Sequence, residues 1–243
     1  MVAFVDCHSH VVPSGDDGAQ SLAEGAQLCE IAQASGTEIL YATPHVRPGQ
    51  LLDLEREAAI EAAFEELRRD ASLELRLGYE LTPAPELLDE DPARYVLEGT
   101  NVVLVEVPFT GPADGFLELA EHVEAAGLVP LVAHPERTEA VQSRTSFADE
   151  LAERGWPLQV NSTSLVGRHG AEAAGIAWRL VEGGQAKVVA SDGHRLTRPA
   201  RLDDAYELVR DRVGEEEALR LFDGSALGLR SRPTPSRAGA RGA

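Results

Sequence analysis

Short apolar segments alternate with amphipathic segments along most of this chain, and that alternation restricts the fold more than any other feature. Residues 101–107 are almost continuously apolar, which is typical of a strand buried on both faces. Residues 50–70 instead place Ile60, Phe64 and Leu67 on one face of a helix. Strands that alternate with helices form βα units with a parallel sheet. The sequence therefore predicts an α/β fold.

This alternation of expected strands and helices continues through the acidic part of the chain. The expected strands are 2–5, 37–43, 73–80, 101–107, 128–133, 157–160 and 187–190. Ser21 and Glu24 form a capping-box pattern at the start of a first helix that ends at Gly36, and Asp114 is expected to cap a later helix. Further helices are expected at 86–89, 143–154, 170–182, 202–209 and 215–222. No second domain boundary is evident, so a single domain is expected over residues 1–228.

The chain is strongly acidic. Its formal net charge is −19, and residues 230–243 contain four Arg and no acid, so residues 1–229 carry −23. We therefore expect no nonspecific binding to nucleic acid. From residue 229 onward the composition shifts to Arg, Pro, Ser, Gly and Ala, which predicts a disordered basic tail over 229–243.

Cysteine and apolar patterns bear on the cellular location. Cys7 and Cys29 fall in an expected strand and an expected helix, so both are expected to be small core residues in a reducing compartment. No run approaches the roughly 18 apolar residues of a membrane span, and residues 1–25 lack the regions of a signal peptide. A cytoplasmic location without membrane insertion is expected.

Side chains that can bind metal gather at the ends of the expected strands. His8 and His10 follow the first strand, and they point to the same side if that strand continues through them. Five of the seven histidines lie at strand ends, whereas His122 and His169 lie on a helix and in a glycine-rich loop. The candidate set is His8, His10, Asp17, His45, Glu80, Glu106, His134, Asp192 and His194. In α/β barrels the chemistry lies at the C-terminal strand ends, so these side chains are expected to meet.

Each candidate has a structural alternative when it is taken alone. Glu106 can pair with an arginine, and His45 can be a hydrogen-bonded turn residue. Nine N and O ligands without a thiolate instead suit two or three divalent ions such as Mn, Fe or Zn. Such a cluster lowers the pKa of a bridging water and clamps phosphoryl oxygens. We expect a metal-dependent hydrolase of phosphate esters, and acyl or amide hydrolysis stays open on the same grounds.

The order of these residues resembles the PHP (polymerase and histidinol phosphatase) superfamily. Within it, the chain is similar to the manganese-dependent bacterial protein tyrosine phosphatases of capsule and exopolysaccharide loci, over about residues 2–212. The matching motifs are Asp6-x-His8-x-His10, Asp16-Asp17-Gly18, Ala42-Thr43-Pro44-His45, Glu80, Glu106-x-Pro108-Phe109, Ala133-His134-Pro135-Glu136-Arg137, Gln159-Val160-Asn161 and Ser191-Asp192-x-His194. The run Gly78-Tyr79-Glu80 and the segment 161–165 depart mildly from the family pattern.

The resemblance implies a distorted (β/α)7 TIM-like barrel, the PHP fold. It also implies three divalent ions, with Mn preferred over Fe or Zn. The implied ligands of the first ion are His8, His10, Glu80 and Asp192. The second ion is implied to be held by Glu106 and His134, with Glu80 as the bridge. The implied ligands of the third are Asp17, His45 and His194. Arg137 matches a phosphate-binding arginine of the family. Arg198 is the candidate for the second such arginine, and Arg195 stays open as the alternative.

The implied activity is that of a protein tyrosine phosphatase, in which a metal-bridged hydroxide attacks phosphorus while Arg137 stabilises charge on the nonbridging oxygens. Cysteine-based phosphatase chemistry is disfavoured, because neither cysteine begins a Cys-x5-Arg loop. The implied partner is a phosphotyrosyl protein, with a bacterial tyrosine autokinase as a candidate, and the oligomeric state stays open. The alternatives are a PHP phosphatase of a small alkyl phosphate such as histidinol phosphate, and a non-catalytic, metal-stabilised interaction module.

Overall fold

The computed structural model describes residues 3–230, and its strands pair in parallel. One sheet has the order β1-β2-β4 and the other the order β3-β5-β6-β7-β8-β9. The strands are β1 (Phe4–Asp6), β2 (Thr37–Ala42), β3 (His45–Val46), β4 (Glu74–Leu77), β5 (Glu80–Leu81), β6 (Val102–Glu106), β7 (Val129–Ala133), β8 (Leu158–Asn161) and β9 (Ala186–Ala190). Val2, which the sequence places in the first strand, lies outside the described residues.

The two sheets are parts of one barrel with interrupted strands. β3 continues the path of β2, and β5 continues that of β4 after Gly78, where a Cβ would lie 2.5 Å from a side-chain atom of Leu97. The ring closes between β1 and β9, because the amide of Asp192 donates to the carbonyl of His8 over 2.9 Å. Counted in this way, residues 3–230 supply seven strand positions around the barrel, and the expected distorted (β/α)7 fold is confirmed.

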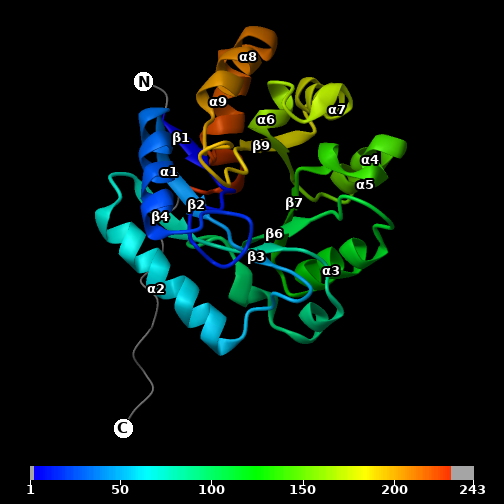
Figure 1. Cartoon of the computed structure of the whole chain (residues 1–243). Coiled ribbons are helices and arrows are strands. Elements are labelled where there is room, and N and C mark those ends of the chain that lie inside the picture. Colours follow the sequence, from blue (N-terminus) through cyan, green and yellow to red (C-terminus); the bar gives the residue numbers. More distant parts are fainter. Residues whose placement is uncertain (1–2, 231–243) are drawn as a thin grey trace.

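Helices cover the outside of the strands (Figure 1). The α-helices are α1 (Leu22–Ala34), α2 (Leu54–Asp70), α3 (Asp114–Ala125), α4 (Glu139–Ser143), α5 (Ser146–Glu153), α6 (Ser162–Leu165), α7 (Gly170–Glu182), α8 (Asp203–Val213) and α9 (Glu215–Phe222). The 3-10 helices are η1 (Pro85–Asp89), η2 (Pro92–Tyr95), η3 (Pro135–Arg137) and η4 (Ser225–Leu227). α1 begins as predicted, since the hydroxyl of Ser21 accepts from the amide of Glu24 over 3.2 Å.

Three predicted helix boundaries are wrong. Asp114 is the first residue of α3 rather than its cap, and the preceding residue makes no side-chain capping bond. α2 begins at Leu54 instead of residue 50, because Asp53 caps it by accepting from the amide of Arg56 over 2.8 Å. The helix expected at 143–154 is α5, which begins only at Ser146, whereas Ser143 is the last residue of the separate helix α4. Periodicity predicts that a helix exists, but capping contacts decide where it starts.

On β1, β2, β6 and β7, alternate apolar residues belong to two separate apolar clusters. Val103 on β6 packs in the larger cluster together with helix residues such as Phe116. Leu104 belongs to the smaller cluster, whose members come mainly from strands, so this cluster fills the barrel. Strand side chains alternate between two faces. Glu106 therefore faces the interior at the C-terminal end of β6.

Leu229 contradicts the expected start of the disordered tail. Its side chain is fully buried, and its carbonyl accepts from the hydroxyl of Tyr41 over 3.1 Å and from Arg76 over 2.8 Å. The chain therefore stays attached to the barrel at this point. The remainder of the expected tail, 231–243, lies outside the described residues. Within residues 3–230, none of the helices combines the length and the apolar character that crossing a membrane requires.

Candidate metal centre

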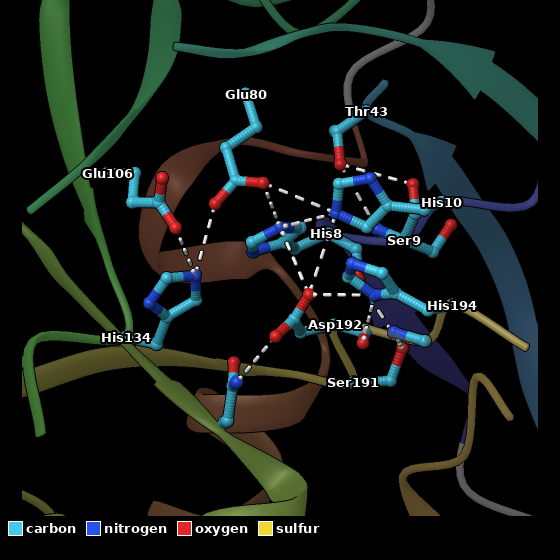
Figure 2. A network of polar contacts seen from close by, with 12 residues as sticks. His8, Ser9, His10, Thr43, Glu80, Glu106, His134, Ser191, Asp192 and His194 are labelled. Carbon is cyan, nitrogen blue, oxygen red and sulfur yellow. Dashed lines mark hydrogen bonds and ion pairs between the residues drawn. The ribbon is translucent and has the colours of Figure 1, made fainter. Parts of the chain in front are cut away.

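The residues predicted from the strand ends meet at the C-terminal end of the barrel. Figure 2 shows His8, His10, Glu80, Glu106, His134, Asp192 and His194 of this set. Eight of them are buried, namely His8, His10, His45, Glu80, Glu106, His134, Asp192 and His194. Asp17 is the exception, with 61% of its side chain exposed. These buried residues form four overlapping groups of three. In each group, the N and O atoms that can bind a metal lie within 4.8 Å of one another.

Glu80, the first residue of β5, lies at the centre of this group. Its Oε2 is 3.1 Å from Nε2 of His8, 3.2 Å from Nε2 of His10 and 3.0 Å from Nδ1 of His45. Its Oε1 is 3.0 Å from Nε2 of His134. Oε2 is buried, yet it has no hydrogen-bond partner among the described residues. A buried carboxylate is costly unless positive charge lies beside it, so this geometry favours a cation between Glu80 and the imidazoles.

His8 and His10 converge as predicted. β1 ends at Asp6, but strand-like pairing continues beyond it, because Ser9 forms a parallel bridge with Gly193. In this bridge the amide of His10 donates to the carbonyl of Gly193 over 2.7 Å. The two Nε2 atoms are 3.2 Å apart. Pairing of the loop with its neighbour therefore aligns the two rings.

Glu106 and His134 lie at the ends of β6 and β7. Oε1 of Glu106 is 3.8 Å from Nε2 of His134, and its Oε2 accepts from the hydroxyl of Thr82 over 2.7 Å. Burial and then the charge of Glu80 raise the pKa of Glu106 to about 8. The ring of Phe109 stacks on His134 with centroids 5.4 Å apart. This pair therefore extends the central group toward a partly exposed aromatic ring.

His45, His194 and Asp17 form the outer part of the site. Oδ1 of Asp17 is 3.6 Å from Nε2 of His45, and Oδ2 is 3.5 Å from Nε2 of His194. The ring of His10 contacts both histidines, with centroid distances of 4.4 and 3.9 Å. The exposed Asp17 thus contacts the buried group only at its edge.

Asp192 divides its two oxygens between the histidines and an arginine. Oδ1 is 3.5 Å from Nε2 of His8 and 3.2 Å from Nδ1 of His194. Oδ2 accepts from Nη1 of Arg137 over 2.6 Å. The guanidinium of Arg137 also lies over the ring of Phe109, 4.7 Å from its centroid. Asp192 and Phe109 together hold Arg137 at the border of the site.

The structure distinguishes the two arginines that the sequence leaves open. Nη2 of Arg198 lies 3.8 Å from Oδ1 of Asp192. Nε of Arg195 instead pairs with Glu24 at 2.7 Å, outside the buried group. Arg198 is therefore the arginine that lies beside Arg137 at the site.

Two buried residues of the site have backbone conformations that are unusual for residues with a side chain. The φ angle of His134 is 31° and that of Asp192 is 51°, and these are the positive φ angles among the described non-glycine residues. Such conformations cost on the order of 1–3 kcal/mol and persist only where surrounding contacts compensate. His134 directly follows β7, and Asp192 lies shortly after the end of β9. In both places the turn directs the side chain into the site.

The carboxylates and imidazoles of the site shift one another's proton affinities. Burial alone would raise the pKa of Glu80, but the charges of His8 and His45 outweigh it and hold this pKa well below its ordinary value. Burial opposes a charge on His8, yet Glu80 and Asp192 raise its pKa. At His134 burial prevails and lowers the pKa. Without cations, protons on some of the rings balance the carboxylates.

A set of polar residues, which the sequence motifs contain but to which they assign no role, lies behind the candidate ligands. Oδ2 of Asp16 is 3.5 Å from Nδ1 of His10, and Oε1 of Gln159 is 3.0 Å from Nδ1 of His8. Gln159 and Asn161 are fully buried on β8. A signal was present in the sequence, because Gln159 lies between apolar residues of the strand expected at 157–160 and Asn161 directly follows that strand.

Comparison with known proteins gives relatives along nearly the whole chain. The chain is 29% identical to tyrosine-protein phosphatase YwqE of Bacillus subtilis (strain 168), over 94% of this chain and 92% of the relative. It is 28% identical to tyrosine-protein phosphatase CpsB of Streptococcus agalactiae, over 90% of this chain and 95% of the relative.

Among solved structures, one from a study of YwqE from Bacillus subtilis and CpsB from Streptococcus pneumoniae, described as metal-dependent tyrosine phosphatases, superposes with a TM-score of 0.78. It is 28% identical and covers 88% of this chain and 89% of its own. The family model for capsular polysaccharide synthesis proteins CpsB/CapC matches residues 4–227. The protein belongs to this CpsB/CapC family.

Proposed function

We propose that this protein is a metal-dependent protein tyrosine phosphatase whose ions bind at the C-terminal end of the barrel. The observation that carries the proposal is the carboxylate of Glu80, which lies 3.0 to 3.2 Å from nitrogens of four imidazole rings. The similarity to YwqE and CpsB, which are tyrosine-protein phosphatases, supports the same activity here.

The donor set fits divalent ions. Oε2 of Glu80 is buried without a hydrogen bond among the described residues, and the surrounding donors are imidazole nitrogens and carboxylate oxygens. Such a set suits Mn, Fe or Zn, and we propose three Mn ions. The proposed ligands of the first ion are His8, His10, Glu80 and Asp192. The second is proposed to bind Glu106, His134 and the bridging Glu80. The third is proposed to bind Asp17, His45 and His194.

Bound ions would supply a water of lowered pKa and positive charge for the phosphoryl oxygens. Arg137 and Arg198 lie on the same side of the site, 2.6 and 3.8 Å from oxygens of Asp192. We assign to both arginines the binding of the nonbridging phosphoryl oxygens. Their charges would stabilise the charge that develops as the bond from phosphorus to the leaving oxygen breaks.

A tyrosyl leaving group suits this arrangement. Tyrosinate has a reference pKa of about 10, so it leaves with less protonation than an alkoxide needs. Phe109 is 42% exposed and contacts both His134 and Arg137, so an aromatic face lies next to the proposed phosphoryl site. Aromatic side chains pack favourably against other aromatic rings. This neighbour supports an aryl phosphate as the substrate class.

The proposal includes a partner and a location. A phosphotyrosyl protein is the proposed substrate, with a bacterial tyrosine autokinase as the candidate, and the family's description supports a role in capsular polysaccharide synthesis. Cys7 and Cys29 are buried free thiols, as is usual for proteins of a reducing compartment, and this supports a cytoplasmic location.

The test compares three substrates with Mn supplied: a phosphotyrosyl peptide, the matched phosphoseryl peptide and histidinol phosphate. We expect the highest kcat/KM for the phosphotyrosyl peptide, loss of hydrolysis on chelation and recovery when Mn is returned. A preference for histidinol phosphate would favour the small-substrate phosphatase instead. Bound ions without hydrolysis of any of the three would favour a non-catalytic module.

A further inference from the structure

Gln159 and Asn161 take no part in the proposed chemistry, although both are fully buried. On β8 they alternate with Leu158 and Val160, which pack in the larger apolar cluster between the strands and the helices, so Gln159 and Asn161 face the barrel interior. Buried amide groups are costly unless they are hydrogen-bonded. The destination of their hydrogen bonds therefore indicates what they do.

The two amide side chains connect three proposed metal ligands by a continuous row of hydrogen bonds. Nδ1 of His8 lies 3.0 Å from Oε1 of Gln159, and this oxygen also accepts from the amide of His134 over 3.3 Å. Nε2 of Gln159 donates to Oδ1 of Asn161 over 2.8 Å. Nδ2 of Asn161 donates to Oδ2 of Asp192 over 2.9 Å.

The ends of this row determine the direction of every bond in it. The backbone amide of His134 can only donate, so it must face the oxygen of Gln159. The carboxylate of Asp192 can only accept, so it must face the nitrogen of Asn161. Nδ1 of His8 faces the same Gln159 oxygen, an acceptor, and must therefore carry a proton. The lone pair of a neutral His8 is then on Nε2, the nitrogen that faces the centre of the site.

We propose that Gln159 and Asn161 are positioning residues that prepare His8 and Asp192 for metal binding. Gln159 selects the tautomer of His8. Asn161 and Arg137 together hold Oδ2 of Asp192, which leaves Oδ1 toward the histidines. Partners of this kind behind metal ligands contribute to metal affinity. The inference rests on the proposed function, since it takes His8 and Asp192 to be metal ligands.

The test is metal binding by Gln159→Met, which removes both the acceptor and the donor at similar side-chain length. Zinc is the probe, because it is diamagnetic, and its affinity is measured by competition with a chelating dye. We expect binding to weaken by about 10- to 100-fold. NMR of the Nδ1 proton of His8 in the zinc-loaded protein is the second readout. That proton should give a slowly exchanging signal in the wild type and exchange rapidly with water in the variant.

Two further variants separate positioning from a general loss of stability. Gln185→Met removes a partly buried amide that lies just before β9, at the opposite end of the barrel, and should keep both the zinc affinity and the His8 signal. Gln159→Glu keeps an acceptor for His8 and for the amide of His134, so it should retain the His8 signal even if Gln159→Met does not fold. Fast exchange of the His8 proton in Gln159→Glu would overturn the inference.

Unchanged zinc affinity together with an unchanged His8 signal in Gln159→Met would also overturn it. A different result would count against the metal centre itself: if the wild-type protein bound no zinc and no manganese, the proposed function would fail, whatever the variants did. The two failures are therefore distinguishable in the same set of measurements.

Discussion

Replacing Glu106 by Gln should stabilise the metal-free protein, and the gain should grow with pH. Burial and the charge of Glu80 raise the pKa of Glu106 from its ordinary value of 4.5 to about 8. The amide of Glu106→Gln is neutral at every pH, and its oxygen can still accept the hydrogen bond that Thr82 makes over 2.7 Å. The substitution therefore measures how much the buried, ionisable carboxyl of Glu106 lowers the unfolding free energy.

The sign of the effect follows from proton binding. Below the pKa that Glu106 has in the unfolded chain, its carboxyl is protonated in both the folded and the unfolded protein. The unfolding free energies of wild type and variant therefore change with pH in nearly the same way there. Between the unfolded and the folded pKa, the unfolded chain loses its proton while the folded protein keeps it, so wild-type stability falls as pH rises. Each pH unit corresponds to about 1.4 kcal/mol, which gives a loss of about 3 kcal/mol by neutral pH.

The measurement is urea unfolding of chelator-treated wild type and Glu106→Gln at several values from about pH 5 to about pH 8. The difference in unfolding free energy should increase by a few kcal/mol over this range. Glu118→Gln, at an exposed position on α3, is the matched control and should show a constant difference. A pH-independent difference for Glu106→Gln would refute the reasoning. With Mn restored the wild type should gain more stability than the variant, because the variant lacks one proposed ligand.

Three further outcomes are expected. The double variant His8→Ala with His10→Ala should lose bound metal and hydrolysis but keep the circular dichroism spectrum of the barrel; full activity would contradict the metal centre. Arg137→Ala, assayed with enough Mn to load both proteins fully, should lower kcat/KM for a phosphotyrosyl peptide by about 10²- to 10³-fold, and unchanged kinetics would remove its assigned role. Phe116→Ala, at a fully buried position of α3, should lower the unfolding free energy by about 3–5 kcal/mol in a urea titration without changing metal content.

Much of the fold was predictable because its signals are local. α7 and α9 have the predicted bounds, 170–182 and 215–222, since their apolar periodicity is confined to one segment each. The interruptions between β2 and β3 and between β4 and β5 were not predictable. At Gly78 it accompanies the close approach of Leu97, a contact that links segments about twenty residues apart and leaves no local pattern.

The site was predictable to the extent that strand ends locate it. Glu106 is an interior residue by simple alternation along β6. The choice between Arg195 and Arg198 depends instead on a turn, in which the amide of Arg198 donates to the carbonyl of Arg195 over 2.8 Å. That turn directs Arg195 to Glu24 and Arg198 toward Asp192. Residue type and spacing cannot predict such a separation of two nearby arginines.

The charges of the site explain how a cluster of carboxylates remains folded inside an acidic protein of net charge −19. In the metal-free protein, Glu106 retains a proton at neutral pH, and the pKa of His8 is raised by Glu80 and Asp192 against the effect of burial. Protons therefore occupy the positions at which the proposed function places cations. Because one group cannot bind a proton and a metal at the same atom, metal binding must release protons. The exchange also reverses the local field. An acidic chain repels a phosphate ester, whereas bound cations together with Arg137 attract it.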